Sequence, residues 1–277
     1  MSYAYSARLL YERLTQPKEK ATKQLLALAP VFADTLSNTT AARNRSVLGY
    51  HQPTSVINTI NALDKTRMDQ AKTTTPEVSR GWLLNGQYVS PLLASKREVE
   101  TIAQLFRQRQ NAAKVYLYDQ AREEQLKAGD ITHYNYLHLA THGFVNESYP
   151  ELSGLILAQD STSKEDGILY MGEIYNLRLN ADLVTLSACE TGLGKLANGE
   201  GVIGLTRALM YAGARNIVVS FWKVPDNSTA DLMEDFYTAL ISGEDKAQAL
   251  QTAKRKMARA DKYKHPFYWA PFVLVGK

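Results

Sequence analysis

Two segments decide the fold expected of this chain, Tyr136-Leu-His-Leu-Ala-Thr-His142-Gly-Phe and Asp182-Leu-Val-Thr-Leu-Ser-Ala-Cys189-Glu-Thr-Gly-Leu-Gly. Each is an apolar run of strand length that is followed by a reactive side chain. Apolar residues at both alternating positions indicate strands buried on both faces, as in a mainly parallel sheet. Because ligands bind outside the carboxyl ends of such strands, we expect His142 and Cys189 to face one cleft.

Similar apolar runs alternate with helical patterns along most of the chain. This alternation predicts an α/β domain of three layers, with a mostly parallel sheet of about six strands and helices on both faces. Ser95 and Glu98 have the spacing of a capping box at the start of one helix. The predicted strands are Leu25–Val31, Val115–Tyr118, Tyr136–Ala140, Gly154–Ala158, Leu183–Ala188, Asn216–Trp222 and Phe272–Val275, and the predicted helices are Ser95–Phe106, Glu200–Tyr211, Ser228–Ile241 and Asp245–Arg259.

Residues 37–90 break this pattern. They are rich in Ser, Thr, Asn, Gln and Arg and show little periodicity. A long, loosely patterned stretch within a compact domain is usually an insertion, a lid or a loop, so we predict a peripheral polar insertion or mobile loop. Residues 1–36 are expected to supply the first strand and helix of the domain, and residues 91–277 the rest of its core.

Composition and charge exclude several classes of protein. Of the 277 residues, 45% are hydrophobic and 22% charged, which is the balance of an ordinary globular protein. The single cysteine excludes a disulfide framework and fits a reducing cytoplasm. Neither a signal peptide nor an apolar run of about 18 residues is found, so no membrane contact is expected. We interpret the basic clusters at Lys18–Lys23 and Lys254–Arg259 as solvated helix faces, and therefore expect no direct contact with nucleic acid.

His142 and Cys189 carry the predicted chemistry. A thiol becomes an effective nucleophile when a nearby imidazole accepts its proton. The glycines that follow each residue allow backbone N–H groups to approach a developing oxyanion. This chemistry requires neither a cofactor nor a metal ion, and we predict none. Taken by itself, a cysteine at a strand end is alternatively a small buried hydrophobe.

The run Gly199-Glu-Gly-Val-Ile-Gly204 matches the glycine spacing of dinucleotide-binding enzymes. In those enzymes the first glycine follows a strand directly, whereas Gly199 lies ten positions after Cys189. We therefore interpret Gly204 as a site of close helix packing. Dinucleotide binding stays as the least favoured alternative function.

Six stretches of the chain match one family: His138–Gly143, Leu186–Gly192, Gly199–Leu209, Ala212–Ser220, Trp222–Asp226 and His265–Ala270. In these stretches the chain resembles the CHAT family of caspase-related cysteine peptidases, which are relatives of separases, gingipains and legumains. The resemblance implies a caspase-like fold and a cysteine endopeptidase that cleaves one or a few protein partners through an acyl-enzyme. It further implies a regulatory role of the bacterial defence or cell-death type. A repeat domain of tetratricopeptide type, or another regulatory partner, is expected to be missing from this chain.

The resemblance also implies roles for individual residues. His142 would act as the general base or acid and Cys189 as the nucleophile. The backbone N–H groups of Gly143 and Cys189 would form the oxyanion hole, and no third catalytic residue is required. The main alternative is a catalytically silent interaction module with the same fold. The presence of His142, Gly143 and Cys189 together favours the enzyme.

Substrate binding is assigned by the resemblance to Ser187, Glu190, Trp222 and Asp226. Two interpretations of Asp226 stay open. It either pairs with a basic side chain at the floor of the primary pocket, or it caps the helix that begins near Ser228. The first predicts cleavage after Arg or Lys, and the second allows an uncharged residue at that position.

Overall fold

The computed structural model describes residues 2–3, 21–32, 82–84, 87–146, 149–159, 163–187, 189–190 and 200–276. The chain divides into two units, one made of residues 1–31 and 92–277 and the other of residues 32–91. In the second unit the structure describes an antiparallel hairpin of β3 (Trp82–Leu84) and β4 (Gln87–Val89). The helix expected within residues 1–36 and most of the insertion expected at 37–90 lie outside the described residues.

The larger unit is built on one sheet, to which seven of the described strands belong. Six of them correspond to strands predicted from the sequence, and the seventh is a two-residue strand near the start of the chain. Five neighbouring strands are parallel, and the last strand of the chain runs antiparallel beside them. In spatial order the strands are β1 (Ser2–Tyr3), β13 (Phe272–Val275), β12 (Ile217–Ser220), β10 (Leu183–Leu186), β6 (Tyr134–Leu139), β2 (Lys23–Ala29) and β5 (Ala113–Leu117).

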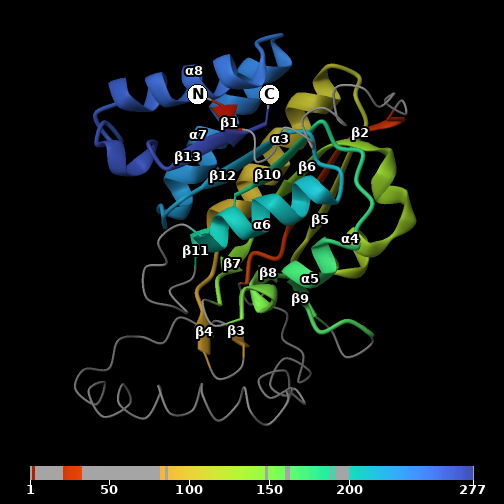
Figure 1. Cartoon of the computed structure of the whole chain (residues 1–277). Helices are drawn as coiled ribbons and strands as arrows, with labels where there is room; N and C mark the ends of the chain where they lie inside the picture. The colour runs from red at the N-terminus through yellow and green to blue at the C-terminus, as the bar shows by residue number, and fades with distance from the viewer. Residues whose placement is uncertain are drawn as a thin grey trace, which may run out of the picture. The chain divides into compact units, whose positions relative to one another are not determined.

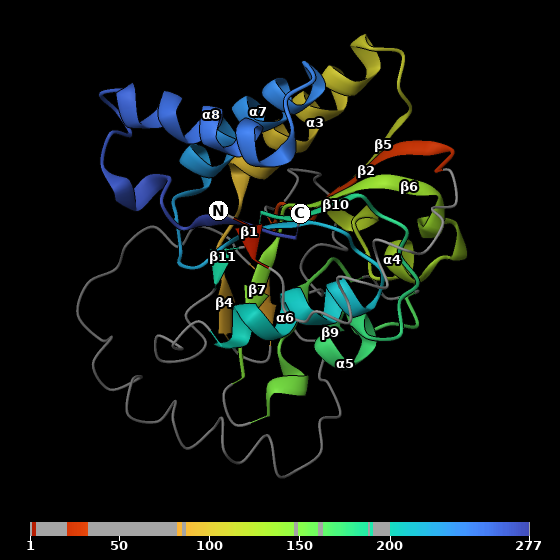
Figure 2. The ribbon, with the colours of Figure 1, turned by 45° about the horizontal axis from the view of Figure 1, so that its top comes forward.

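Helices cover both faces of this sheet. Figures 1 and 2 show α3 (Leu93–Gln108), α7 (Asp226–Ile241) and α8 (Lys246–Arg259) on one face and α6 (Glu200–Tyr211) with the shorter helices α4 (Glu124–Lys127) and α5 (Met171–Ile174) on the other. The three-layer α/β sandwich predicted from the sequence is thus confirmed. Short 3₁₀ turns are η2 (Tyr118–Gln120), η3 (Gly129–His133), η4 (Pro150–Leu152) and η5 (Pro266–Tyr268).

The strands are apolar at both alternating positions because each face has its own helical layer. On the α6 side, alternate residues of four strands join one buried cluster with the inner side of α6. Removing this apolar surface from water is the main stabilising contribution of that layer. The cluster includes Leu26, Leu28, Leu137, Leu139, Val184, Leu186, Ile217 and Val219 from the sheet, and Val202, Leu205 and Leu209 from α6.

The start of α3 differs from the prediction. Its N-cap residue is Leu92, whose own side chain makes no capping hydrogen bond. The Ser95 hydroxyl donates to the Leu92 carbonyl at 2.6 Å, and Glu98 is buried rather than turned back to the helix start. The predicted capping box is therefore wrong, because Glu98 has a stronger partner inside the protein.

The other helix boundaries lie close to those predicted. α7 begins at Asp226, two residues before the predicted start, with Pro225 as its N-cap residue. α8 is capped by Asp245, whose carboxylate accepts from the Gln248 N–H at 2.9 Å. Gly213 follows α6 with a φ of 117°, and a Cβ there would lie 2.0 Å from the Leu179 carbonyl oxygen. Only glycine fits this helix end.

A second, four-stranded sheet lies at the carboxyl ends of the main sheet. The strand predicted at Gly154–Ala158 belongs to it, and not to the main sheet. The first two strands of this second sheet contain the residues that follow β6 and β10 in the chain. In spatial order its strands are β11 (Cys189–Glu190), β7 (His142–Phe144), β8 (Gly154–Ile156) and β9 (Ile168–Tyr170).

Candidate active site

The second sheet brings the backbones of His142 and Cys189 side by side. β7 and β11 pair in parallel, with Cys189 opposite His142 and Glu190 opposite Gly143. The strands that precede them in the chain, β6 and β10, are also paired in the main sheet, with Leu139 opposite Leu186. Each strand resumes three residues later in the second sheet without a change of register. The sequence predicted reactive residues just beyond two strand ends, whereas the structure places them within two new short strands.

His142 is held from both sides. β7 lies between β11 and β8, and His142 is opposite Ile156 across the β8 edge. The hydroxyl of the preceding Thr141 donates to the Ile156 carbonyl, which ties the entry to β7. Both Thr141 and the His142 side chain are fully buried. The histidine therefore has a fixed backbone and a shielded imidazole.

Ser187 and Trp222 lie at the ends of neighbouring strands. Ser187 directly follows β10 and is 6% exposed. Its Oγ has no hydrogen-bond partner within the described part of the chain. Trp222 lies two residues after β12, and its indole Nε1 donates to the Phe267 carbonyl at 3.0 Å. This bond directs the Trp222 ring to η5.

Asp226 caps a helix other than its own. Its Oδ2 accepts from the Ala94 N–H at 2.5 Å, in the first turn of α3. The side chain therefore supplies the acceptor that the start of α3 lacks locally. The pKa of Asp226 is raised to about 6, mainly by burial and in part by the nearby charge of Glu98, while the Ala94 N–H and Arg97 oppose the shift. The prediction that Asp226 caps α7 is wrong, because Pro225 is the N-cap residue of α7 and Asp226 caps α3 instead.

A buried polar network lies four residues upstream of His142, on the α3 and α7 side of the sheet. His138 Nε2 is 2.7 Å from Glu98 Oε1, and its Nδ1 is 3.2 Å from the Tyr237 hydroxyl. That hydroxyl is 2.9 Å from Thr185 Oγ1. The four side chains are at most 2% exposed. They join α3 and α7 to strands β6 and β10.

Sequence reasoning missed this network because it assigned Glu98 to a helix cap. A signal was present, however. His138 and Thr185 are polar residues inside apolar strands, which requires polar partners across the interior. Their partners are 40 and 52 residues away in the chain, so the pairing needed the tertiary structure.

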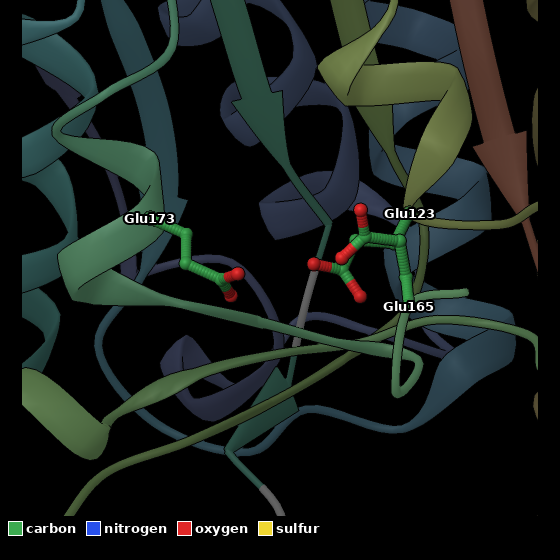
Figure 3. A group of neighbouring side chains, drawn as sticks. All are labelled: Glu123, Glu165 and Glu173. Atoms are coloured by element: carbon green, nitrogen blue, oxygen red, sulfur yellow. The ribbon is translucent and has the colours of Figure 1, made fainter.

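A second cluster of titratable side chains surrounds Lys127, the last residue of α4. Figure 3 shows the carboxylates of Glu123, Glu165 and Glu173, which approach one another from separate segments. Lys127 Nζ lies 2.6 Å from Glu123, 2.6 Å from Glu165 and 2.7 Å from Glu173. Burial raises the pKa of Glu123 to about 7, against the opposing effect of Lys127. The ammonium group already supplies the cation that these carboxylates require, so we interpret the group as a structural ion network.

Comparison with known proteins identifies the family. The family described as "CHAT domain" matches residues 1–277, which confirms the resemblance drawn from the motifs. Tetratricopeptide repeat protein 28 of Mus musculus is 31% identical over 109 residues, which cover 39% of this chain and 4% of that protein. Its Homo sapiens counterpart is 32% identical over 117 residues, covering 42% of this chain and 5% of that protein. The match thus spans a small part of these relatives.

One solved structure with a similar arrangement is the Arg-specific cysteine proteinase gingipain R. The TM-score is 0.44 with 10% sequence identity, over 92% of this chain and 46% of the proteinase chain. As for membranes, no helix in the described residues combines the length and the apolar character that a crossing would need.

Proposed function

Because this chain belongs to the CHAT-domain family over residues 1–277, we propose that it is a cysteine endopeptidase. Cys189 is the proposed nucleophile and His142 the proposed general base and acid. The observation that carries the proposal is the register of β7 and β11, in which Cys189 is the direct partner of His142. Paired positions on neighbouring strands have Cα atoms roughly 5 Å apart, a separation from which a thiol and an imidazole can meet.

The reaction would proceed in two halves. His142 takes the thiol proton, and the thiolate of Cys189 attacks the carbonyl carbon of the scissile bond. The N–H groups of Gly143 and Cys189 are the proposed donors to the oxyanion. The imidazolium then protonates the leaving amine as the C–N bond breaks, which leaves a thioester on Cys189. A water molecule gives its proton to His142, attacks the thioester, and releases the carboxylic acid and the free thiol.

Of the four residues assigned to substrate binding, Ser187, Glu190 and Trp222 stay proposed contacts, whereas Asp226 has a structural partner. The buried Ser187 hydroxyl, without a partner among the described residues, supports a polar contact with the substrate. Glu190 is opposite Gly143 and adjoins Cys189, which places its backbone beside the proposed oxyanion hole. For Asp226, the bond to Ala94 occupies one carboxylate oxygen in a structural role. This supports an uncharged residue, rather than Arg or Lys, before the cleaved bond.

The wider role is proposed from the relatives. The curated relatives are tetratricopeptide repeat proteins, of which the match covers 4% and 5%. We propose that a repeat domain, or another regulatory partner, controls cleavage of one or a few protein substrates, as in bacterial defence or cell death. A reducing cytoplasmic setting would keep the single thiol free for catalysis.

A second candidate is an interaction module without catalysis. The observation that favours it is the complete burial of the His142 side chain, which closes the imidazole to substrate in this conformation. The peptidase requires that this site open, whereas the module does not. The two candidates therefore differ in whether Cys189 ever reacts.

The deciding experiment measures both cleavage and thiol reactivity. We expect the chain to generate new N-termini in a set of candidate partner proteins, and Cys189→Ala to abolish them. We expect iodoacetamide to alkylate Cys189 rapidly near neutral pH, and His142→Ala to slow this reaction. His133→Ala is the matched control, because His133 is an exposed histidine outside the site. Slow alkylation with no response to His142→Ala, together with no new N-termini, would establish the module instead.

A further inference from the structure

An apolar pocket opens beside Gly143 on the α6 side of the sheet. It is a shallow hollow of about 360 Å³, a volume that includes open solvent at its mouth. The described residues that line it are Gly143, Phe144, Val145, Leu155, Leu186, Val202, Leu205, Val219 and Ser220.

The lining carries no titratable side chain among these described residues. Its one hydroxyl, that of Ser220, donates to the Trp222 carbonyl at 2.6 Å and is thereby satisfied within the protein. A charged group that entered would lose its hydration without gaining a partner among these residues. An apolar side chain would instead gain free energy by moving its apolar surface from water to this apolar lining.

The pocket adjoins the two proposed catalytic positions. Gly143, on its wall, directly follows His142 in β7. Leu186, also on its wall, is the last residue of β10 and lies three positions before Cys189. A peptide whose carbonyl reaches Cys189 would therefore place a neighbouring side chain over this opening.

Asp226, the residue that would bind a basic substrate side chain, lies on the other face of the sheet. Successive residues of a strand point to opposite faces. Leu186 lines the pocket on the α6 side, whereas the preceding Thr185 bonds Tyr237 of α7. Asp226 bonds the first turn of α3, in that same opposite layer. Its carboxylate is not among the described lining of the pocket.

We infer that this pocket accepts an uncharged, apolar side chain of the substrate, from a residue next to the cleaved bond. The inference rests on the proposed peptidase function and adds its substrate class. Pocket contacts that differ by one methylene group typically discriminate by roughly 10–200-fold. A preference of at least about tenfold for Leu or Met over Lys, Arg, Asp or Glu is expected at that position.

The test uses a peptide library in which the residues on both sides of the bond vary, with cleavage sites identified by mass spectrometry. The position that shows the apolar preference identifies which side of the bond the pocket serves. Val145 is a half-buried lining residue and tolerates change best. Val145→Asp should shift the preference toward Lys or Arg, and Val145→Phe should shift it toward small side chains such as Ala. Tyr211→Asp, on the exposed side of α6, is the control and should leave the profile unchanged.

Melting curves establish that each variant is folded before its profile is compared. A preference for charged residues in the unmodified chain, or identical profiles for both Val145 variants, would overturn this inference while leaving the peptidase intact. Absence of any cleavage, with no labelling of Cys189 by peptide acyloxymethyl ketones bearing Leu, Met, Arg or Asp, would instead overturn the proposed function, and the inference with it.

Discussion

The two faces of the central sheet are stabilised in different ways, although the same strands form both. On the α6 face, alternate residues of β6 and β10 enter a continuous apolar cluster. On the α3 and α7 face, His138 and Thr185 of those strands belong to a closed polar network with Glu98 and Tyr237. Apolar packing is non-directional, whereas hydrogen bonds require particular partners in particular places. The α3 and α7 face also buries apolar side chains, such as Ile102, Phe106 and Phe236. The comparison indicates that its polar network adds to this packing a specification of how the helices dock.

Disrupting the polar network should cause the largest loss of stability. Glu98→Ala leaves the buried His138 Nε2 without its partner at 2.7 Å. Leaving a buried polar group unsatisfied costs about 1–3 kcal/mol, and the cavity left by the deleted side chain adds to this, for about 3–5 kcal/mol in all. We expect a loss of that size in the free energy of unfolding, measured by chemical denaturation.

A double substitution tests whether that loss reflects the unpaired histidine. Glu98→Leu combined with His138→Phe replaces both polar partners by apolar groups, which often costs much less than removing one. The double variant should therefore be more stable than Glu98→Ala. Equal or lower stability would mean that Glu98 contributes through packing and not through the network.

The apolar face should respond with a slightly smaller loss. Leu209→Ala, on the inner side of α6, deletes a side chain that is 2% exposed and belongs to the apolar cluster. Such truncations cost about 2–5 kcal/mol, depending on how far the cavity collapses. We expect about 3 kcal/mol by denaturation. A cost below that of an exposed-site control such as Tyr211→Ala would refute the assignment of Leu209 to the buried apolar cluster.

Removing one hydroxyl from the polar network should cost less again. Tyr237→Phe keeps the ring and its edge contacts with Phe106 and Phe236. It removes the hydrogen bonds to His138 and Thr185. Leaving such groups unsatisfied costs about 1–3 kcal/mol. Thermal melting of Tyr237→Phe against Phe236→Leu separates this polar contribution from simple ring packing.

The smallest effect concerns pH and Asp226. Since burial raises its pKa from 3.8 to about 6, the folded protein binds a proton more tightly than the unfolded chain. The stability that this proton contributes is present below about pH 4 and is lost as pH rises through about 6. Asp226→Asn keeps an oxygen acceptor for Ala94 but cannot ionise. Its unfolding free energy should therefore fall less than that of the unmodified chain between pH 4 and 7.

The matched control for this titration is Asp261→Asn, because Asp261 is fully exposed. It should follow the unmodified chain throughout the pH range. If Asp226→Asn follows it as well, the Asp226 carboxyl is not buried as described.

Much of the fold was predictable because it depends on local patterns. The apolar runs at β2, β6, β10 and β13 are long enough to identify buried strands, and the periodicity of α6 gave its bounds without error. Glu98 shows where such reasoning ends. Its spacing from Ser95 satisfies a local rule, yet a histidine 40 residues away is the partner it bonds. Local rules do not indicate which distant polar group will share the same interior.

The sequence by itself therefore determined the alternation of strands and helices, the family, and the identity of His142 and Cys189 as the residues to examine. These follow from the period of side-chain burial and from motifs contiguous in the chain. Only the tertiary structure decided that β7 and β11 form a second sheet, that Asp226 caps α3 across 132 residues, and that an apolar pocket adjoins Gly143. Each of these depends on which segments lie side by side after folding, because a hydrogen bond or a pocket is set by proximity in space and not by spacing along the chain.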